Sequence, residues 1–116
     1  ARITAQDPDK DFAPSTGRIT TWKAPGGHGV RMDTHVYAGF EISPYYDPMI
    51  AKLIVFGRDR AEATAKLQVA LHEFEVEGIL TNIPFLRRLV AHPDYVAGRV
   101  DTGFVPRFLA EAPVGV

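Results

Sequence analysis

The residues best suited to chemistry lie in one short segment, 43–48, which reads Ser-Pro-Tyr-Tyr-Asp-Pro. Its Tyr45, Tyr46 and Asp47 lie between two prolines, which fix φ and bias each preceding residue toward extended backbone. Such a segment holds a carboxylate in a narrow set of directions, as a residue that orients another group requires. From the residues alone, however, Asp47 is more simply explained as a turn aspartate that accepts hydrogen bonds from nearby backbone amides.

The other groups that could do chemistry stand apart from one another. Lys52 interrupts an apolar run, and its long stem lets the ammonium reach a surface, so a surface lysine is favoured over a catalytic one. Arg2 would ordinarily be an exposed arginine of no consequence. The four histidines have no metal-ligand spacing and there is no cysteine, so the pattern predicts neither a metal site nor a disulfide.

Short strands and tight turns are predicted for the first half of the chain, which must position these groups. Polar and apolar residues alternate there, and clusters of Gly, Pro, Asp and Ser separate the alternating stretches. We expect strands over residues 2–6, 18–22, 30–33 and 49–56, and one or two short strands, hinged at Gly39, over residues 35–42. The strand over 49–56 is the longest, and one of its faces is uniformly apolar and is expected in the core: Met49, Ala51, Leu53 and Val55.

The second half of the chain changes to helical spacing. Asp59 followed by Glu62 predicts a capped helix start, with Gly78 as the stop. Thr81 is expected to cap a second helix that ends at Pro93, and a final short helix is expected over about 106–110. The predicted fold class is therefore α+β, with short antiparallel strands, a long buried strand near 49–56, two packed helices and a short C-terminal helix.

Length and composition limit the kind of protein this is. A chain of 116 residues is enough for one domain, and 46% hydrophobic with 23% charged residues is ordinary for a globular protein. The net charge of -1 gives no reason to expect nucleic acid or an anionic membrane as a partner. The chain starts without Met in an alternating pattern and shows no signal peptide, so we expect a piece of a longer polypeptide.

Six segments, in order, resemble one known family: "ARITAQDP", "FAPSTGRI", "PGGHGVRMD", "YAGFEISPYYDPMIAKLI", "EGILTNIPFL" and "GRVDTGF". Together they resemble the C-terminal domain of biotin carboxylase, found in acetyl-CoA, propionyl-CoA, methylcrotonyl-CoA, pyruvate and related carboxylases. The resemblance implies a single domain over residues 1–116, without the ATP-grasp lobes of the enzyme. It is silent on the acyl substrate, because a separate carboxyltransferase component selects it.

In the family reaction, ATP activates bicarbonate as carboxyphosphate, and the resulting carbon dioxide is captured by N1 of biotin. The resemblance implies that Arg2, which matches the arginine of the family's C-R-I-N-A-E-D motif, stabilises the charge on the ureido oxygen of deprotonated biotin. A planar, permanently charged guanidinium suits that oxyanion better than a lysine does. The resemblance also implies that Asp47, the aspartate of the Y-Y-D motif, pairs with Arg2 and orients it.

Four more positions carry a role by resemblance. Gly103 and Phe104 lie in a segment that resembles the one closing over the adenine, and they are candidate nucleotide contacts, with a core position as the alternative for Phe104. His28 and Arg31 match the dimer-contact region, which implies an isologous interface. The sequence departs from the common family pattern at three positions: Thr4, Gln6 and Phe104.

The implied small molecules are biotin on a carrier protein, ATP and bicarbonate, with Mg²⁺ bound by the missing ATP-grasp part. The implied partners are those ATP-grasp lobes, a biotin carboxyl carrier protein or domain, a carboxyltransferase component and a second copy of the parent in a homodimer. The implied compartment is the cytoplasm, with the mitochondrial matrix also open. The isolated domain is expected to be inactive.

Two other functions fit some of the residues. The chain could be a non-catalytic structural module that dimerises the same carboxylase through Arg31 and its neighbours. It could also be a biotin carrier domain with Lys52 as the acceptor, but an acceptor lysine lies exposed at a hairpin tip, whereas Lys52 lies inside a predicted strand.

Overall fold

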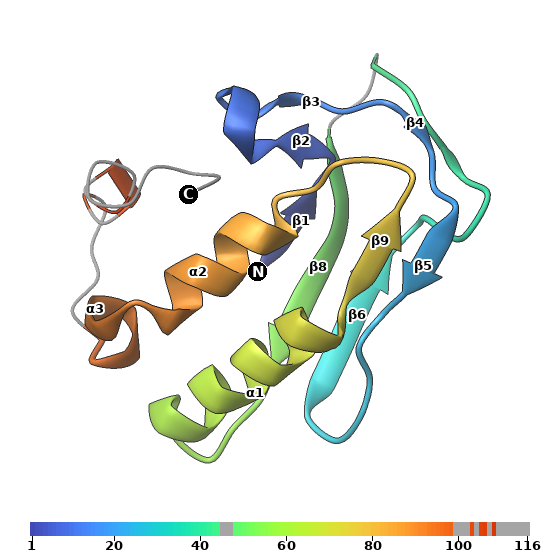
Figure 1. The fold of residues 1–116 in the computed structure, drawn as a ribbon. Helices are drawn as coiled ribbons and strands as arrows, with labels where there is room; N and C mark the ends of the chain where they lie inside the picture. Colours follow the sequence, from blue (N-terminus) through green and yellow to red (C-terminus); the bar gives the residue numbers. More distant parts are fainter. Residues whose placement is uncertain (45–47, 99–102, 104, 107, 109–116) are drawn as a thin grey trace.

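The computed structural model describes residues 1–44, 48–98, 103, 105, 106 and 108. It confirms the α+β prediction, with a three-stranded antiparallel sheet in the order β1 (Arg2–Thr4), β8 (Met49–Val55) and β6 (Val30–Thr34). Helices α1 (Arg60–Glu73) and α2 (Ile83–Ala91) pack on each other, and α1 packs on β8. Figure 1 shows both helices on one side of β8.

The remaining strands form two-stranded antiparallel ladders around this sheet. The pairs are β2 (Gln6–Asp7) with β3 (Ala13–Pro14), β4 (Gly17–Arg18) with β7 (Glu41–Ile42), and β5 (Thr21–Lys23) with β9 (Glu75–Glu77). The single strand predicted over 18–22 is therefore wrong in detail. The strand is interrupted between β4 and β5 because these two segments pair with different partners, β7 and β9.

The face of β8 that points toward the helices forms the centre of the core. Ala51 and Leu53 are buried there, as predicted, and Ile3 of β1 packs beside them with no exposed surface. Met49 and Val55 are only half-buried, and of these two only Val55 contacts the core, so the prediction of a core position is wrong for Met49. The register shift between Ile3 and Thr4 places Met49 opposite Thr4, and Ile50 is buried instead.

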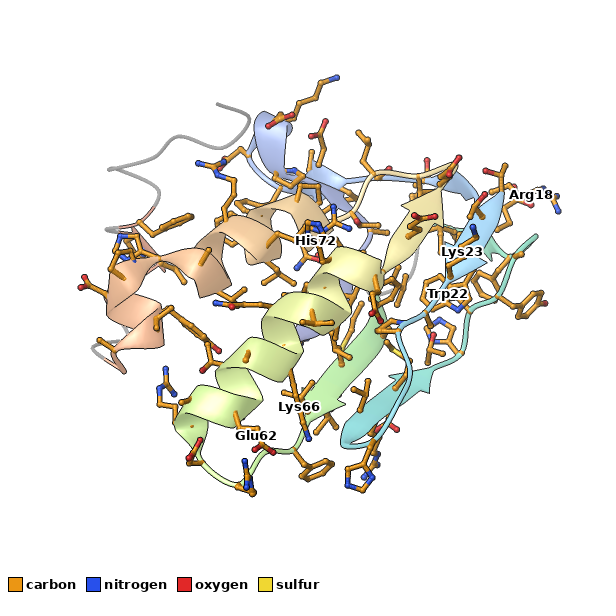
Figure 2. The ribbon with its side chains drawn as sticks, turned by 60° about the horizontal axis from the view of Figure 1, so that its bottom comes forward. Arg18, Trp22, Lys23, Glu62, Lys66 and His72 are labelled. Atoms are coloured by element: carbon orange, nitrogen blue, oxygen red, sulfur yellow. The ribbon has the colours of Figure 1, made fainter. Side chains whose placement is uncertain are left out.

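The start of α1 has the capping interaction that its sequence predicts. Asp59 Oδ1 accepts a hydrogen bond from the Glu62 N–H at 2.8 Å, while Glu62 accepts from the Arg58 side chain at 2.6 Å. These contacts with Arg58, and the nearby Lys66 ammonium, lower the pKa of the Glu62 carboxyl below its ordinary value. Figure 2 shows Glu62 and Lys66 together on the first turns of α1. Lys66 Nζ lies 3.5 Å from Glu62 Oε1.

The end of α1 differs from the prediction. The helix stops at Glu73, because Phe74 takes extended backbone and leads directly into β9. Gly78, the predicted stop, lies after β9 instead, where its φ of +98° turns the chain. Trp22 of β5 packs edge-on against Phe74 at 5.2 Å between ring centres, at the end of α1 visible in Figure 2.

Arg87 of α2 closes the end of α1. Its Nε donates to the Leu71 carbonyl at 2.7 Å, and its Nη2 donates to the carbonyls of Phe74 at 2.9 Å and His72 at 3.4 Å. The last carbonyls of a helix lack partners within the helix and carry partial negative charge. One half-buried guanidinium therefore both caps α1 and fastens it to α2.

We expect Arg87→Ala to lower the free energy of unfolding by about 2 kcal/mol, because it leaves partly buried carbonyls without a donor. Urea unfolding followed by the fluorescence of Trp22, the one tryptophan in the sequence, measures this change. Arg87→Lys keeps the charge but cannot reach three carbonyls at once, so a smaller loss is expected. Arg18→Ala, at an exposed arginine, is the control. Equal stability of the Arg87→Ala and Arg18→Ala variants would contradict the capping role.

The C-terminal region only partly matches the prediction. The Thr81 hydroxyl accepts from the Ile83 N–H at 3.3 Å, although the N-cap position itself is Asn82, and α2 ends before Pro93. A short helix that the sequence did not predict, α3 (Pro93–Val96), follows at once. The helix predicted over 106–110 lies partly outside the described residues. Within the described part, no helix is long and apolar enough to cross a membrane.

Candidate functional site

Arg2 lies on β1 with the peptide groups on both sides of it held. The Leu53 N–H donates to the Ala1 carbonyl at 2.8 Å, and the Ala1 nitrogen donates to the Leu53 carbonyl at 2.6 Å. The next pair along the ladder, Arg2 with Lys52, is therefore the closer, non-hydrogen-bonded kind, with Cα atoms about 4.5 Å apart. Their side chains leave the same face of the sheet side by side.

We call this the outer face of the sheet, since it is the one turned away from the core residues Ile3 and Leu53. Pairing with β6 extends it across the third strand, because Asp33 lies opposite Lys52 and Arg31 lies opposite Ile54. The outer face is formed by Arg2, Arg31, Asp33, Lys52 and Ile54. It is mostly exposed and carries three cations against one carboxylate.

That one carboxylate is already engaged. Asp33 accepts from Arg31 Nε at 3.1 Å and from Arg31 Nη2 at 3.0 Å, and the hydrogen bond raises the pKa of the Arg31 guanidinium. Among the residues that the structure describes, neither Arg2 nor Lys52 forms an ion pair. Like charges directly opposite each other on a sheet are unfavourable, so this pair suits a site that receives an anion.

Sequence reasoning missed Asn82, which closes the open edge of β1. Its side-chain Oδ1 accepts from the Thr4 N–H at 2.9 Å, and its Nδ2 donates to the Arg2 carbonyl at 3.0 Å. Its own N–H donates to the Thr4 carbonyl at 3.2 Å. A single buried residue thus takes the place of a neighbouring strand. Its position just before a helix suggests only a cap, and no local pattern reveals a partner 80 residues away.

Asp47 and Phe104 lie outside the described residues, so their predicted contacts stay predictions. Pro48, which follows Asp47, accepts from the Ala5 N–H at 2.8 Å, three positions along the chain from Arg2. Gly103 is exposed in a turn after α3.

The sequence profile of the biotin carboxylase C-terminal domain matches residues 1–107 of this chain. The chain belongs to the biotin carboxylase C-terminal domain family. Its resemblance to that family, seen in the Arg2 and Asp47 motifs, is thereby confirmed.

Relatives of this biotin carboxylase C-terminal domain come from several carboxylases. It is 49% identical to biotin carboxylase of Nostoc sp. over 90% of the chain, and 49% identical to the mitochondrial methylcrotonoyl-CoA carboxylase subunit alpha of Dictyostelium discoideum over 91%. The chain spans 23% and 15% of those two proteins. It thus corresponds to a quarter or less of the length of each relative.

A solved structure agrees with the fold of this biotin carboxylase C-terminal domain. It is the biotin carboxylase domain dimer of 2-oxoglutarate carboxylase from Hydrogenobacter thermophilus, in complex with MgADP, ADP and bicarbonate. The TM-score is 0.90 at 39% identity, and the match covers 93% of this chain and 24% of that one.

The predicted dimer contacts of the domain are both at the surface. His28 is exposed in the turn before β6, and Arg31 extends from β6 on the outer face with its side chain 62% exposed. The predicted catalytic arginine and the predicted dimer arginine thus share one face of one sheet. In the described residues no group of three or more His, Cys, Asp or Glu could hold a metal ion.

Proposed function

We propose that this chain is the C-terminal lobe of a longer biotin carboxylase, an ATP-dependent ligase that carboxylates biotin on a carrier protein with bicarbonate. The observation that carries the proposal is Arg2, an exposed guanidinium on a strand held on both edges, beside a second cation at Lys52. Family membership and the short share of each relative that the chain spans support a role as one part of a larger enzyme.

In this proposal, Arg2 donates to the ureido oxygen of biotin as N1 loses its proton and negative charge develops on that oxygen. A donor fixed before the reaction stabilises that charge without having to reorganise during it. Asp47 pairs with the guanidinium and orients it. The ATP-dependent step forms carboxyphosphate from bicarbonate, and carboxyphosphate breaks down to carbon dioxide and phosphate. The phosphate accepts the N1 proton, and the resulting enolate-like biotin attacks the carbon dioxide.

Most of the nucleotide-binding site of the proposed enzyme lies outside this chain. Gly103 and Phe104 contribute one wall of the nucleotide site, while the ATP-grasp lobes hold MgATP and supply the phosphate-binding groups. The isolated chain is accordingly inactive. The carrier protein or domain brings biotin to Arg2, and a carboxyltransferase component uses the product. We place the parent enzyme in the cytoplasm or the mitochondrial matrix.

The test is an assay of the full-length protein that contains this chain. We expect ADP release to require bicarbonate and Mg²⁺, and free biotin to accumulate label from ¹⁴C-bicarbonate. Bicarbonate-dependent ADP release without any labelled biotin would favour a different acceptor. No ADP release at all would contradict the proposal. The second candidate, a structural and dimerisation module of the same carboxylase, is favoured if the Arg2→Ala variant carboxylates biotin as fast as the unmodified protein.

The carrier alternative has little support. Lys52 lies in the middle of β8, the central strand of the sheet, with β1 on one side and β6 on the other. A streptavidin blot of the native full-length protein tests it directly. A signal that persists in the Lys52→Arg variant excludes this lysine as the acceptor.

We also propose that His28 and Arg31 contact a second copy of the parent through an isologous interface. Because each interface residue then occurs twice, Arg31→Glu places two unfavourable charges in the interface and also loses the bond to Asp33. Sedimentation of the full-length protein is expected to show the dimer dissociation constant raised at least tenfold. Arg18→Glu, at an exposed arginine paired with Glu41, is the matched control. Equal dissociation constants for the two variants would place the interface elsewhere.

A further inference from the structure

Asn82 occupies the N-cap position of α2 but does not cap it. Asparagine is among the preferred N-cap residues, because its side-chain oxygen accepts from a free N–H of the first turn. In this structure the Asn82 side chain makes no such bond to the helix. Both ends of its amide are directed at β1 instead, to the Arg2 carbonyl and the Thr4 N–H.

These bonds act on the backbone that aims Arg2. The peptide carbonyl before Arg2 is held by the Leu53 N–H at 2.8 Å, and the carbonyl after it is held by Asn82 at 3.0 Å. With both flanking peptide planes held, φ and ψ of Arg2 are fixed, and so is the direction in which its Cβ leaves the strand. The β1–β8 register shifts between Ile3 and Thr4, and such irregularities re-aim side chains. Asn82 bonds to the backbone on both sides of Ile3, close to this shift.

We propose that Asn82 is a positioning residue for Arg2: its amide sets the backbone from which the guanidinium reaches the biotin ureido oxygen. This inference rests on the proposed function. A strand at the edge of a sheet is hydrogen-bonded along one side only. Asn82 provides hydrogen bonds along the other side of β1. A displacement of about 1 Å at a reacting group costs on the order of a hundredfold in rate.

The test uses Asn82→Asp in the full-length enzyme, an isosteric change. It keeps the acceptor for the Thr4 N–H but turns a second oxygen toward the Arg2 carbonyl, where the donor was. We expect biotin carboxylation to fall tenfold or more, while ADP release without biotin stays within about twofold. Gln68→Glu is the matched control, because Gln68 also donates an amide N–H to a backbone carbonyl, that of Val90, at 2.9 Å.

The decisive readout is the same change in an Arg2→Ala background, because residues that act as one unit have non-additive effects. If Asn82 works through Arg2, Asn82→Asp causes no further loss of biotin carboxylation there. A further loss of the same size would overturn the inference, since a general weakening of the domain lowers the rate in both backgrounds.

Two other results separate this inference from the proposed function. If Arg2→Ala itself leaves biotin carboxylation unchanged, the proposed function is overturned, and the inference falls with it. If Arg2→Ala lowers the rate but Asn82→Asp behaves like Gln68→Glu, only the role of Asn82 is overturned. Should the isosteric variant fail to fold, Asn82→Ala, which removes the amide donor without adding a charge, takes its place in the same comparison.

Discussion

Replacing Arg2 with alanine in the full-length enzyme is expected to lower biotin carboxylation by about a hundredfold or more. Bicarbonate-dependent ATP cleavage in the absence of biotin is expected to persist. The two rates separate because the guanidinium is needed only where charge develops on the ureido oxygen. Forming carboxyphosphate uses groups outside this chain. Measuring ADP release and labelled biotin in the same reaction mixtures gives both rates.

Two variants sharpen this prediction. Arg2→Lys keeps a positive charge next to Lys52 but loses the planar pair of donors, so it is expected to recover only part of the rate. Asp47→Asn is expected to show a milder form of the same defect, because it removes an orienting partner and leaves the donor. If both rates are unchanged in Arg2→Ala, or if both fall together with loss of the dimer, Arg2 is structural and the domain is a scaffold.

Replacing Gly78 with alanine is expected to have the largest effect on stability, a loss of about 3 kcal/mol or more. Two costs combine at this residue. Its φ of +98° is strained for any residue with a Cβ, and an added Cβ would collide with the Arg18 carbonyl oxygen and approach the Thr20 nitrogen at 2.8 Å. Both neighbours are backbone atoms, and Thr20 N–H is already bonded to the Glu77 carbonyl at 2.8 Å. Relief would require the chain between β4 and β5 to move away from β9.

The chain offers two matched glycine controls for this prediction. An added Cβ meets nothing within 4 Å at either Gly26 or Gly27, but only Gly27 has a positive φ, of +122°. Gly26→Ala is therefore expected to be near neutral, and Gly27→Ala to show the cost of backbone strain alone. Urea unfolding of all three variants, followed by Trp22 fluorescence, separates strain from collision. A loss at Gly78 no larger than that at Gly27 would show that the backbone yields to the added methyl group.

Local patterns predict the start of α1, the presence of α2 and the central strand of this fold. The alternation at 30–33 places Val30 and Met32 inward and leaves Arg31 exposed, as the structure shows. The capped start at Asp59 is also present. The strand predicted over 18–22 failed because alternation reports which face is buried and not which strand is the partner. The change of partner at residue 19 is decided by β7 and β9, far along the chain.

The candidate site was only half predictable for the same reason. Arg2 and Asp47 could be singled out through their motifs, since those motifs are continuous in sequence. The opposition of Arg2 and Lys52 depends on strand register, and the role of Asn82 depends on a contact 80 residues away. No spacing rule within one segment reports such a contact, and the ordinary rule for asparagine before a helix predicts a cap.

The two residues that hold β1 also determine when its geometry can form during synthesis. The backbone of Arg2 is held by Leu53, about 50 residues later, and by Asn82, 80 residues later. A nascent chain leaves the ribosome N-terminus first, so the segment with Arg2 must wait unpaired until nearly the whole domain has been made. Contacts so distant in sequence also slow folding, because a long loop must close before they form. Arg2 is therefore expected to be among the first residues of this domain to be translated and among the last to reach its working position.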